Sequence, residues 1–436
     1  MGAFFIFFNP PFQAPDEYMH YSRILQISDG QILPVREGNA IGAKLREDQI
    51  NFLHLLHKKP LKMNEVLQLL KHSDNNSNKS TDSFSWGTTT YNPVAYTPQV
   101  LGVIFARLSR LNQAQTFYLA RLFALLFFIG VVYYSIRLTP LNKWFFAVVA
   151  ALPMTLFLAA SNSGDVTSIG ASIFVIAYFL KLVSQNRMTK KDYLFIVLST
   201  LFIAATKAPY FLVVIFYAFI PKDKFIRPRD RLYLIIILVA VLITVNMLWS
   251  FVTRDLSSAA IGKAMYPTIL SDPQAQIAYI LHNPYQYAKI FIKTIWLQGT
   301  YYINTCIGAL GPLKVWFNQL IYTSYVVVMT VALLGDEAAN LRINKKMRLA
   351  ALLLLVLFIT SIITVMYITW TVPRLNIIEG VQGRYFIPVL FLLPIIAKGL
   401  FFSRATTNKV SFPLFVMIAM IGLSFLICLK FFNFYQ

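Results

Sequence analysis

Charged residues are scarce in this sequence. Asp, Glu, Lys and Arg make up 13% of its 436 residues, whereas soluble domains carry about 25%. Apolar residues reach 57%, more than a soluble fold can keep from water. Apolar stretches close to the roughly 20 residues that cross a hydrocarbon core of about 30 Å recur from residue 116 onward. We therefore predict an all-α integral membrane protein.

Several sequence motifs are also missing. The chain has no Walker loop, no glycine-rich dinucleotide turn and no repeat of its two halves, which argues against ATP-driven pumps and inverted-repeat transporters. Its two cysteines, Cys306 and Cys428, show no metal-binding spacing. The formal charge is +21, but the basic residues form short clusters between apolar segments. This distribution is typical of membrane topology, and we expect no nucleic-acid partner.

The apolar segments predict a bundle of about 10–12 transmembrane helices. The clearest helices are expected at residues 117–137, 144–160, 168–183, 193–205, 209–220, 232–251, 319–334, 349–370, 385–402 and 412–432. Several are short for a full span. We expect kinks or breaks at Pro153, Pro209, Pro388 and Pro394.

The basic clusters predict the orientation of the chain, because short cytoplasmic loops are rich in Lys and Arg. They lie at residues 137–143, 187–191, 222–231, 342–348 and 404–409. The count of helices then places residues 10–116, 161–167, 253–311, 371–384 and the turn at Lys207 outside. It also requires the apolar segments 94–111 and 290–309 to lie along the outer interface instead of crossing.

The whole chain is expected to form one polytopic domain in a bacterial cell membrane, with its active site facing outward. The expected parts are 1–9, the remnant of a truncated first helix; 10–116, an outer loop with interfacial helices; 117–252, a helix bundle; 253–315, a second outer region; and 316–436, the C-terminal helices. The Ser- and Asn-rich run 72–85 is expected to be a mobile loop.

Two adjacent carboxylates, Asp16 and Glu17, lie at the expected outer surface. Pro15 disfavours helix before it, so both acids fall in the first turn of a helix, with His20 one turn later. In the plainer interpretation, Asp16 caps the helix and Glu17 is solvated. Alternatively, one acid takes a proton from a hydroxyl acceptor while its partner or His20 fixes the acceptor or a divalent cation, Mg²⁺ or Mn²⁺.

Two further candidates lie in the turns of the central helices. Asp165, in the string 161–167, is either a helix N-cap or a ligand-binding acid. Lys207 interrupts the apolar hairpin 203–210. A lysine at membrane depth is a functional candidate, and snorkelling to the surface is the alternative.

The string 374–385 opens a late helix and carries Gln382, Arg384 and Tyr385. Its glycines, Gly380 and Gly383, allow the backbone to approach a ligand closely. Arg384 presents a planar set of donors that suits phosphate oxygens. A headgroup anchor or a salt bridge to the nearby Glu379 is the alternative.

Acids that can activate a nucleophile and bases that can hold a phosphate thus share the outer loops. This combination suits a lipid-phosphate substrate with its sugar facing out. The leaving phosphate would then lie near Lys207 and Arg384, which neutralise its developing charge.

The same residues resemble those of a known family, the bacterial multi-pass membrane proteins called domain of unknown function 2142. The resemblance is carried by Pro11 to His20, Gly30 to Pro34, Tyr91 to Gly102, Arg121, Pro153 to Asp165, Lys207 to Tyr210 and Gly380 to Pro388. It implies a GT-C-like bundle. It further implies a polyprenyl-phosphate-dependent glycosyltransferase that transfers a sugar to a glycan or glycolipid acceptor, with Asp16 or Glu17 as the base.

Two other classes of function stay open at this point. A transporter or flippase of lipid-linked sugars would also use outer charges and aromatic residues, but it needs polar residues near the midplane of several helices. A non-catalytic scaffold of a cell-envelope complex would tolerate loss of Asp16 and Arg384. Membrane lipid is a partner in every case.

Overall fold

The computed structural model describes residues 1–37, 40–57, 63–71, 80–83, 87–207, 209–262, 272–335, 341, 343–373, 375–398 and 411–435. Arg342 and Arg374 lie outside these residues, as do the basic cluster 404–409 and the end of the helix expected at 385–402. Most of the 72–85 run also lies outside them. The exception is residues 80–83, which form a strand.

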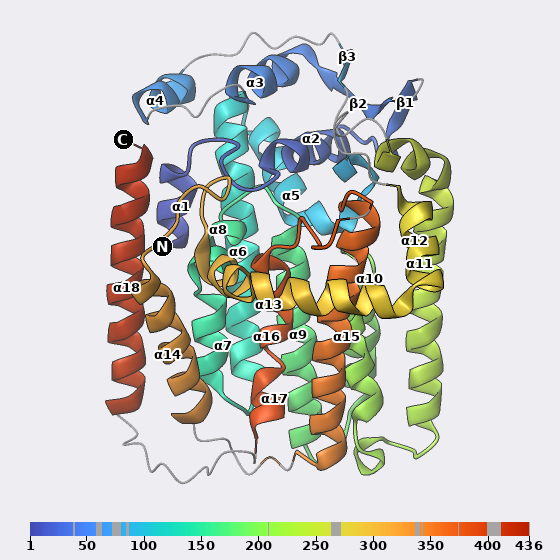
Figure 1. Ribbon diagram of the computed structural model, residues 1–436. Helices are drawn as coiled ribbons and strands as arrows, with labels where there is room; N and C mark the ends of the chain where they lie inside the picture. The colour runs from blue at the N-terminus through green and yellow to red at the C-terminus, as the bar shows by residue number, and fades with distance from the viewer. Residues whose placement is uncertain are drawn as a thin grey trace.

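Five helices among the described residues are long and apolar enough to cross a membrane. They are α6 (Gln113–Leu138), α9 (Asp165–Ser184), α11 (Asp230–Gly262), α15 (Lys345–Thr369) and α18 (Ser411–Tyr435). They run along a common direction, with α18 and α11 at opposite sides of the bundle (Figure 1). The expected all-α membrane protein is confirmed.

The central helix of the bundle is α9. In its most apolar stretch 89% of the residues are buried, against 11% in α11 and α18. A helix that is apolar on all sides needs either a protein interior or lipid around it. The peripheral helices accordingly present exposed apolar side chains such as Met247 and Ile421. Helix α9 is instead enclosed by protein, so its first residue, Asp165, contacts other protein groups.

The other segments of the bundle form shorter helices. They are α7 (Lys143–Ala150), α8 (Pro153–Ala159), α10 (Lys190–Ala204), η3 (Tyr210–Phe219), η4 (Lys222–Lys224), α14 (Gln319–Gly335), η5 (Gly383–Phe386), α16 (Ile387–Leu390) and α17 (Leu393–Ala397).

The breaks in these helices fall at the prolines that the sequence singled out. Helix α8 begins at Pro153, and Pro209 is the N-cap residue of η3. The described part of the helix expected at 385–402 is also broken, as its two prolines led us to expect. Pro388 and Pro394 lack the N–H that an unbroken helix needs, and the segment divides into η5, α16 and α17.

One end of the bundle, the upper end in Figure 1, carries most of the first hundred residues. Its helices are α1 (Gly2–Phe8), α2 (Glu17–Ser28), α3 (Glu47–His57), α4 (Met63–Lys71), η1 (Gly87–Thr90), η2 (Pro93–Tyr96) and α5 (Thr97–Leu108). The same end also carries a small antiparallel sheet, which the sequence did not predict. Its strand order is β1 (Val35–Glu37), β2 (Ala40–Arg46), β3 (Ser80–Ser83). Val35 pairs with Gly42, and Ala43 with Ser83.

Two helices of the second outer region complete this end. Helix α12 (Pro273–His282) leads into α13 (Pro284–Gly308), which lies across the bundle axis, whereas the spanning helices lie along it (Figure 1). This orientation fits the expectation that residues 290–309 do not cross. The backbone of Gly383 contacts α13 so closely that a Cβ atom there would collide with Tyr302 O and Cys306 N.

Candidate functional site

Four charged side chains from segments far apart in the sequence meet at the upper end of the bundle. Arg384, in η5, places Nη2 2.8 Å from Oδ2 of Asp16, which precedes α2. Lys207, after α10, places Nζ 3.2 Å from Oδ1 of Asp165, at the start of α9. Arg384 Nη1 lies 3.9 Å from the second oxygen of Asp165 and links the two pairs. We call Asp16, Asp165, Lys207 and Arg384 the charge cluster.

Asp16 does not act as the helix cap that the plainer interpretation expected. Its backbone is left-handed, with φ at 59°, and its side chain makes no capping hydrogen bond. Asp is among the few residues that adopt this conformation readily. The side chain is 48% exposed and turned toward Arg384. Burial raises the pKa of Asp16, but the charge and hydrogen bond of Arg384, together with the charge of Lys207, outweigh it and hold the pKa below its usual range. The carboxylate is therefore ionised at neutral pH.

The side chain of Lys207 binds groups within the protein instead of snorkelling to the surface. Its Nζ lies over the rings of Tyr91 and Tyr385, 5.8 and 5.2 Å from their centroids, in addition to pairing with Asp165. Burial lowers the pKa of Lys207, but the adjacent Asp165 carboxylate outweighs this and raises the pKa well above its usual range. The lysine is therefore a fixed positive charge within the charge cluster.

Arg384 is the most enclosed cation of the charge cluster, with a side chain 2% exposed. It pairs with Asp16 and not with Glu379, and its Nη2 also donates to the hydroxyl of Tyr385 at 3.3 Å. Its Nε and Nη1 are buried without a hydrogen-bond partner among the described residues. Because buried N–H groups are almost always paired, these two donors are suited to an acceptor supplied by a ligand.

His20 lies close to the charge cluster. Its Nδ1 is 2.7 Å from the hydroxyl of Tyr96. Burial lowers the pKa of His20 to about 4, although the carboxylates of Asp165 and Asp16 oppose this. The imidazole is therefore neutral at physiological pH, and it positions Tyr96 without adding charge.

Glu17, the neighbour of Asp16, belongs to a different assembly. Its carboxylate is bound on both oxygens by Arg121 of α6, at 2.8 and 2.6 Å, and both side chains have no exposed area. Its oxygens also accept from the backbone N–H groups of Phe12 and Asn162. The solvated glutamate of the plainer interpretation is therefore not what the structure shows.

Arg121 uses its remaining donors on the backbone. It donates to the carbonyl oxygens of Ile6, Asn9 and Pro10, where α1 ends. We call Glu17 and Arg121 the clamp, because together they tie α1, α2, α6 and the turn before α9. Arg121 was part of the family resemblance but not of the predicted site. A lone arginine within an apolar helix was the signal that could have identified it.

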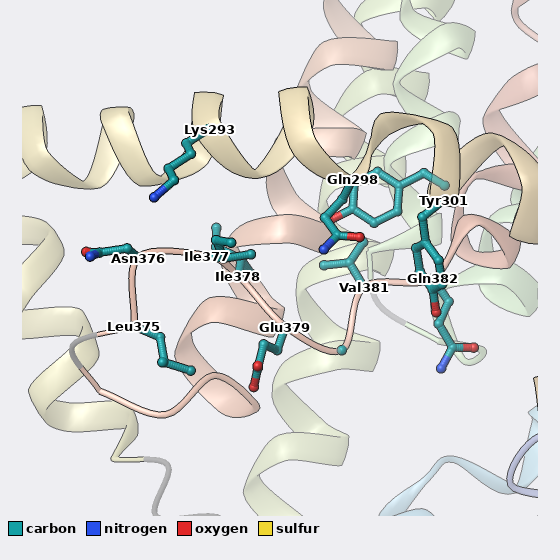
Figure 2. A pocket seen from close by; sticks show the side chains of 12 residues that line it. Lys293, Gln298, Tyr301, Leu375, Asn376, Ile377, Ile378, Glu379, Val381 and Gln382 are labelled. Atoms are coloured by element: carbon teal, nitrogen blue, oxygen red, sulfur yellow. The ribbon is translucent and has the colours of Figure 1, made fainter.

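A pocket of about 690 Å³ lies beside the charge cluster. It is formed by α13 and the segment 375–382, as Figure 2 shows. Gln382, a predicted site residue, lines it together with Glu379. The sequence did not single out the α13 residues of its wall, Gln298 and Tyr301, because the helical pattern does not show which face of α13 meets this segment.

The divalent cation considered from the sequence has no ready site within the described ranges. No group of three or more His, Cys, Asp or Glu side chains there could hold a metal ion. Asp16 and Asp165 instead bind the cationic groups of Arg384 and Lys207. The residues present therefore do not fit a metal.

Comparison with known proteins gives one result. A family model described as predicted membrane protein (DUF2142) matches residues 1–393. No curated protein and no solved structure matches the chain.

Proposed function

The chain belongs to the DUF2142 family of predicted membrane proteins, and from its charge cluster we propose that it is a GT-C-type membrane glycosyltransferase. The proposed donor is a sugar on polyprenyl phosphate, and the acceptor is a glycan or glycolipid at the outer face of a bacterial membrane.

One observation carries this proposal. Asp16, Asp165, Lys207 and Arg384 are distant in sequence but converge at one end of the bundle. The arrangement combines a half-exposed, ionised carboxylate with a buried guanidinium, two of whose donors make no hydrogen bond to the described part of the chain. A base and a phosphate holder are the two groups that sugar transfer from a lipid phosphate needs.

The proposed reaction is a direct displacement. Asp16 takes the proton of an acceptor hydroxyl, and the acceptor oxygen forms a bond to the anomeric carbon as the bond between that carbon and the phosphate oxygen breaks. The bonding pair leaves with the phosphate. Arg384 and Lys207 neutralise the charge that develops on it. The anomeric configuration is inverted, and the polyprenyl phosphate stays in the membrane.

Within this proposal the two adjacent acids have different roles. The Glu17 carboxylate already accepts four hydrogen bonds and is enclosed. It cannot reach an acceptor without leaving Arg121 unpaired. We therefore assign the base to Asp16 and a positioning role to Glu17.

A transporter or flippase of lipid-linked sugars is the main rival. It would bind its substrate near the bilayer midplane, through polar residues on several helices. In the charge cluster each cation is already paired with a carboxylate, and each residue lies at the end of a helix or in η5. This placement favours a fixed site at one membrane face.

The test is sugar transfer by the purified protein from radiolabelled polyprenyl-phosphate sugars to acceptors extracted from the cell envelope. Asp16→Asn is expected to lower the rate by about 10²–10⁴-fold, the usual contribution of a general base, and Asn also tolerates the left-handed backbone at this position. Asp29→Asn is the matched control, because Asp29 forms an ion pair with Arg107 at 2.8 Å away from the charge cluster.

The alternatives predict different results. Equal transfer by the wild type and Asp16→Asn would reject the role of Asp16. No transfer from any donor, together with movement of labelled lipid across vesicles that contain the protein, would favour the transporter. A scaffold would show neither activity, and both variants would support cell-envelope assembly in cells.

A further inference from the structure

We infer that the pocket between α13 and segment 375–382 is the acceptor subsite and binds an uncharged saccharide unit. The inference rests on the proposed function and extends it, because the charge cluster accounts for the donor phosphate but leaves the acceptor without a place.

The size and lining of the pocket select the class of ligand. Its volume of about 690 Å³ lies within the roughly 300–1,000 Å³ of small-molecule sites. Most of its lining side chains are polar, which does not suit a hydrocarbon chain. These side chains are Lys293, Gln298, Tyr301, Tyr302, Asn376, Glu379 and Gln382.

The charges of the lining argue against a phosphate. Lys293 and Glu379 are its charged members, so the described lining has no net charge. Amide side chains can both donate to and accept from sugar hydroxyls. The rings of Tyr301 and Tyr302 offer faces against which the C–H groups of a sugar ring can pack.

Two polar groups of this pocket lack hydrogen-bond partners within the part of the chain that the structure describes. Oε1 of Gln382 and the hydroxyl of Tyr302 are buried without a hydrogen-bond partner among the described residues. In Figure 2, Gln298 and Tyr301 extend from α13 toward the segment that carries Asn376 and Glu379. Groups with unsatisfied hydrogen-bonding capacity on both walls are what a polyhydroxylated ligand would use.

The two walls are fixed to each other at both ends of the pocket. The backbone N–H of Ile378 donates to Thr294 Oγ1 at 3.0 Å, and that of Gly383 donates to Thr305 Oγ1 at 2.8 Å. Both threonines lie on α13, about 16 Å apart along the helix. The pocket is therefore already formed and needs no closure before a ligand binds.

The pocket also lies in the right place for an acceptor. Gln382 lines it and precedes Arg384 by two residues. The Tyr302 ring packs 5.8 Å from that of Phe386, in the same short helix as Arg384. A sugar held here would lie next to the charge cluster, where Asp16 can take its proton.

The experiment measures binding of the methyl glycosides of glucose, galactose, mannose and arabinose to the full-length protein in detergent, by saturation-transfer NMR. At least one glycoside is expected to bind the wild type. Gln298→Ala and Asn376→Ala, on opposite walls, are each expected to weaken it by about two- to tenfold, the effect of losing a hydrogen bond. Gln68→Ala is the matched control, since Gln68 is an exposed amide on α4.

Each outcome has a defined meaning. Binding of no glycoside, or equal binding by both pocket variants and the control, would overturn the inference. If the proposed function were wrong, the result would differ. Glycosides would bind and the pocket variants would bind them more weakly, yet no labelled sugar would be transferred from a lipid donor. Transfer with an unchanged acceptor KM in both pocket variants would reject this pocket and leave the glycosyltransferase proposal standing.

Discussion

Asp16 and Glu17 are adjacent in the sequence and each binds an arginine, but the two ion pairs differ in almost every physical respect. The Asp16–Arg384 pair has a single hydrogen bond and a half-exposed carboxylate, and two buried donors of Arg384 have no hydrogen-bond partner in the described ranges. The Glu17–Arg121 pair is bidentate, fully enclosed and surrounded by backbone partners.

This difference indicates what each pair can do. A saturated buried pair holds segments in place but has no capacity left for a substrate. An unsaturated pair at the edge of a site can exchange a partner for a ligand. The clamp therefore positions the charge cluster, and the charge cluster is the part that reacts.

The largest expected effect tests the clamp. Glu17→Gln would leave the Arg121 charge buried without its counter-ion, which typically costs about 3–5 kcal/mol of folding free energy. We expect a much lower midpoint of unfolding in detergent and less protein in the membrane. Asp16→Asn, in contrast, should lose less stability, because Arg384 keeps Asp165 as a counter-ion 3.9 Å away. Equal loss of stability in the two variants would remove the distinction between the pairs.

Arg384→Gln is expected to have the next largest effect. Transfer should fall by about 10²–10³-fold, since removing one preorganised charge stabiliser has this size of effect. The acid limb of the pH–rate profile should also move to higher pH. The Arg384 guanidinium is the strongest influence lowering the pKa of Asp16, so without it the carboxylate protonates at a higher pH.

The comparison for Arg384→Gln is Arg107→Gln, which also deprives an aspartate of an arginine partner at 2.8 Å. Its rate and pH profile should match the wild type. An acid limb that stays in place in Arg384→Gln would show that Asp16 is not the group whose ionisation the profile reports.

The spanning helices were largely predictable from hydropathy. The predicted 117–137, 168–183 and 349–370 correspond to α6, α9 and α15 within a few residues. The short sheet was not predictable, because its strands are brief and partly polar. The broken segment after Gly383 shows the same limit, because its prolines indicated a disturbance but not where the helices would divide.

The residue types of the candidate site were predictable, but their partners were not. Arg384 and Asp16 are 368 residues apart, and Glu17 and Arg121 are 104 apart. Hydropathy and charge indicate depth and side of the membrane, not which helices are neighbours. The sequence could therefore group Asp16 with Glu17, whereas packing sends their side chains to different arginines.

Gly383→Ala tests the position of Arg384 in the charge cluster and leaves the clamp unchanged. The added Cβ would collide with backbone atoms of α13, so η5 must move away, at a cost of about 1–3 kcal/mol as for other overpacked sites. Transfer should fall together with stability, because Arg384 moves with η5. The control is Gly299→Ala. Gly299 lies on α13, the helix that Gly383 contacts, and an added Cβ there would have nothing within 4 Å. Identical unfolding of the two variants would contradict this close approach.

The smallest effect concerns His20, whose pKa burial lowers from 6.5 to about 4. Between these values the unfolded chain binds a proton that the folded protein does not, so stability rises with pH across this window and is lost as pH falls through it. The midpoint of unfolding of the wild type should therefore be lower at pH 4.5 than at pH 7. His20→Gln, which retains a polar group near Tyr96, should show a shallower drop. An equally steep drop in the variant would mean that other groups, such as the carboxylates of the charge cluster, account for the pH dependence.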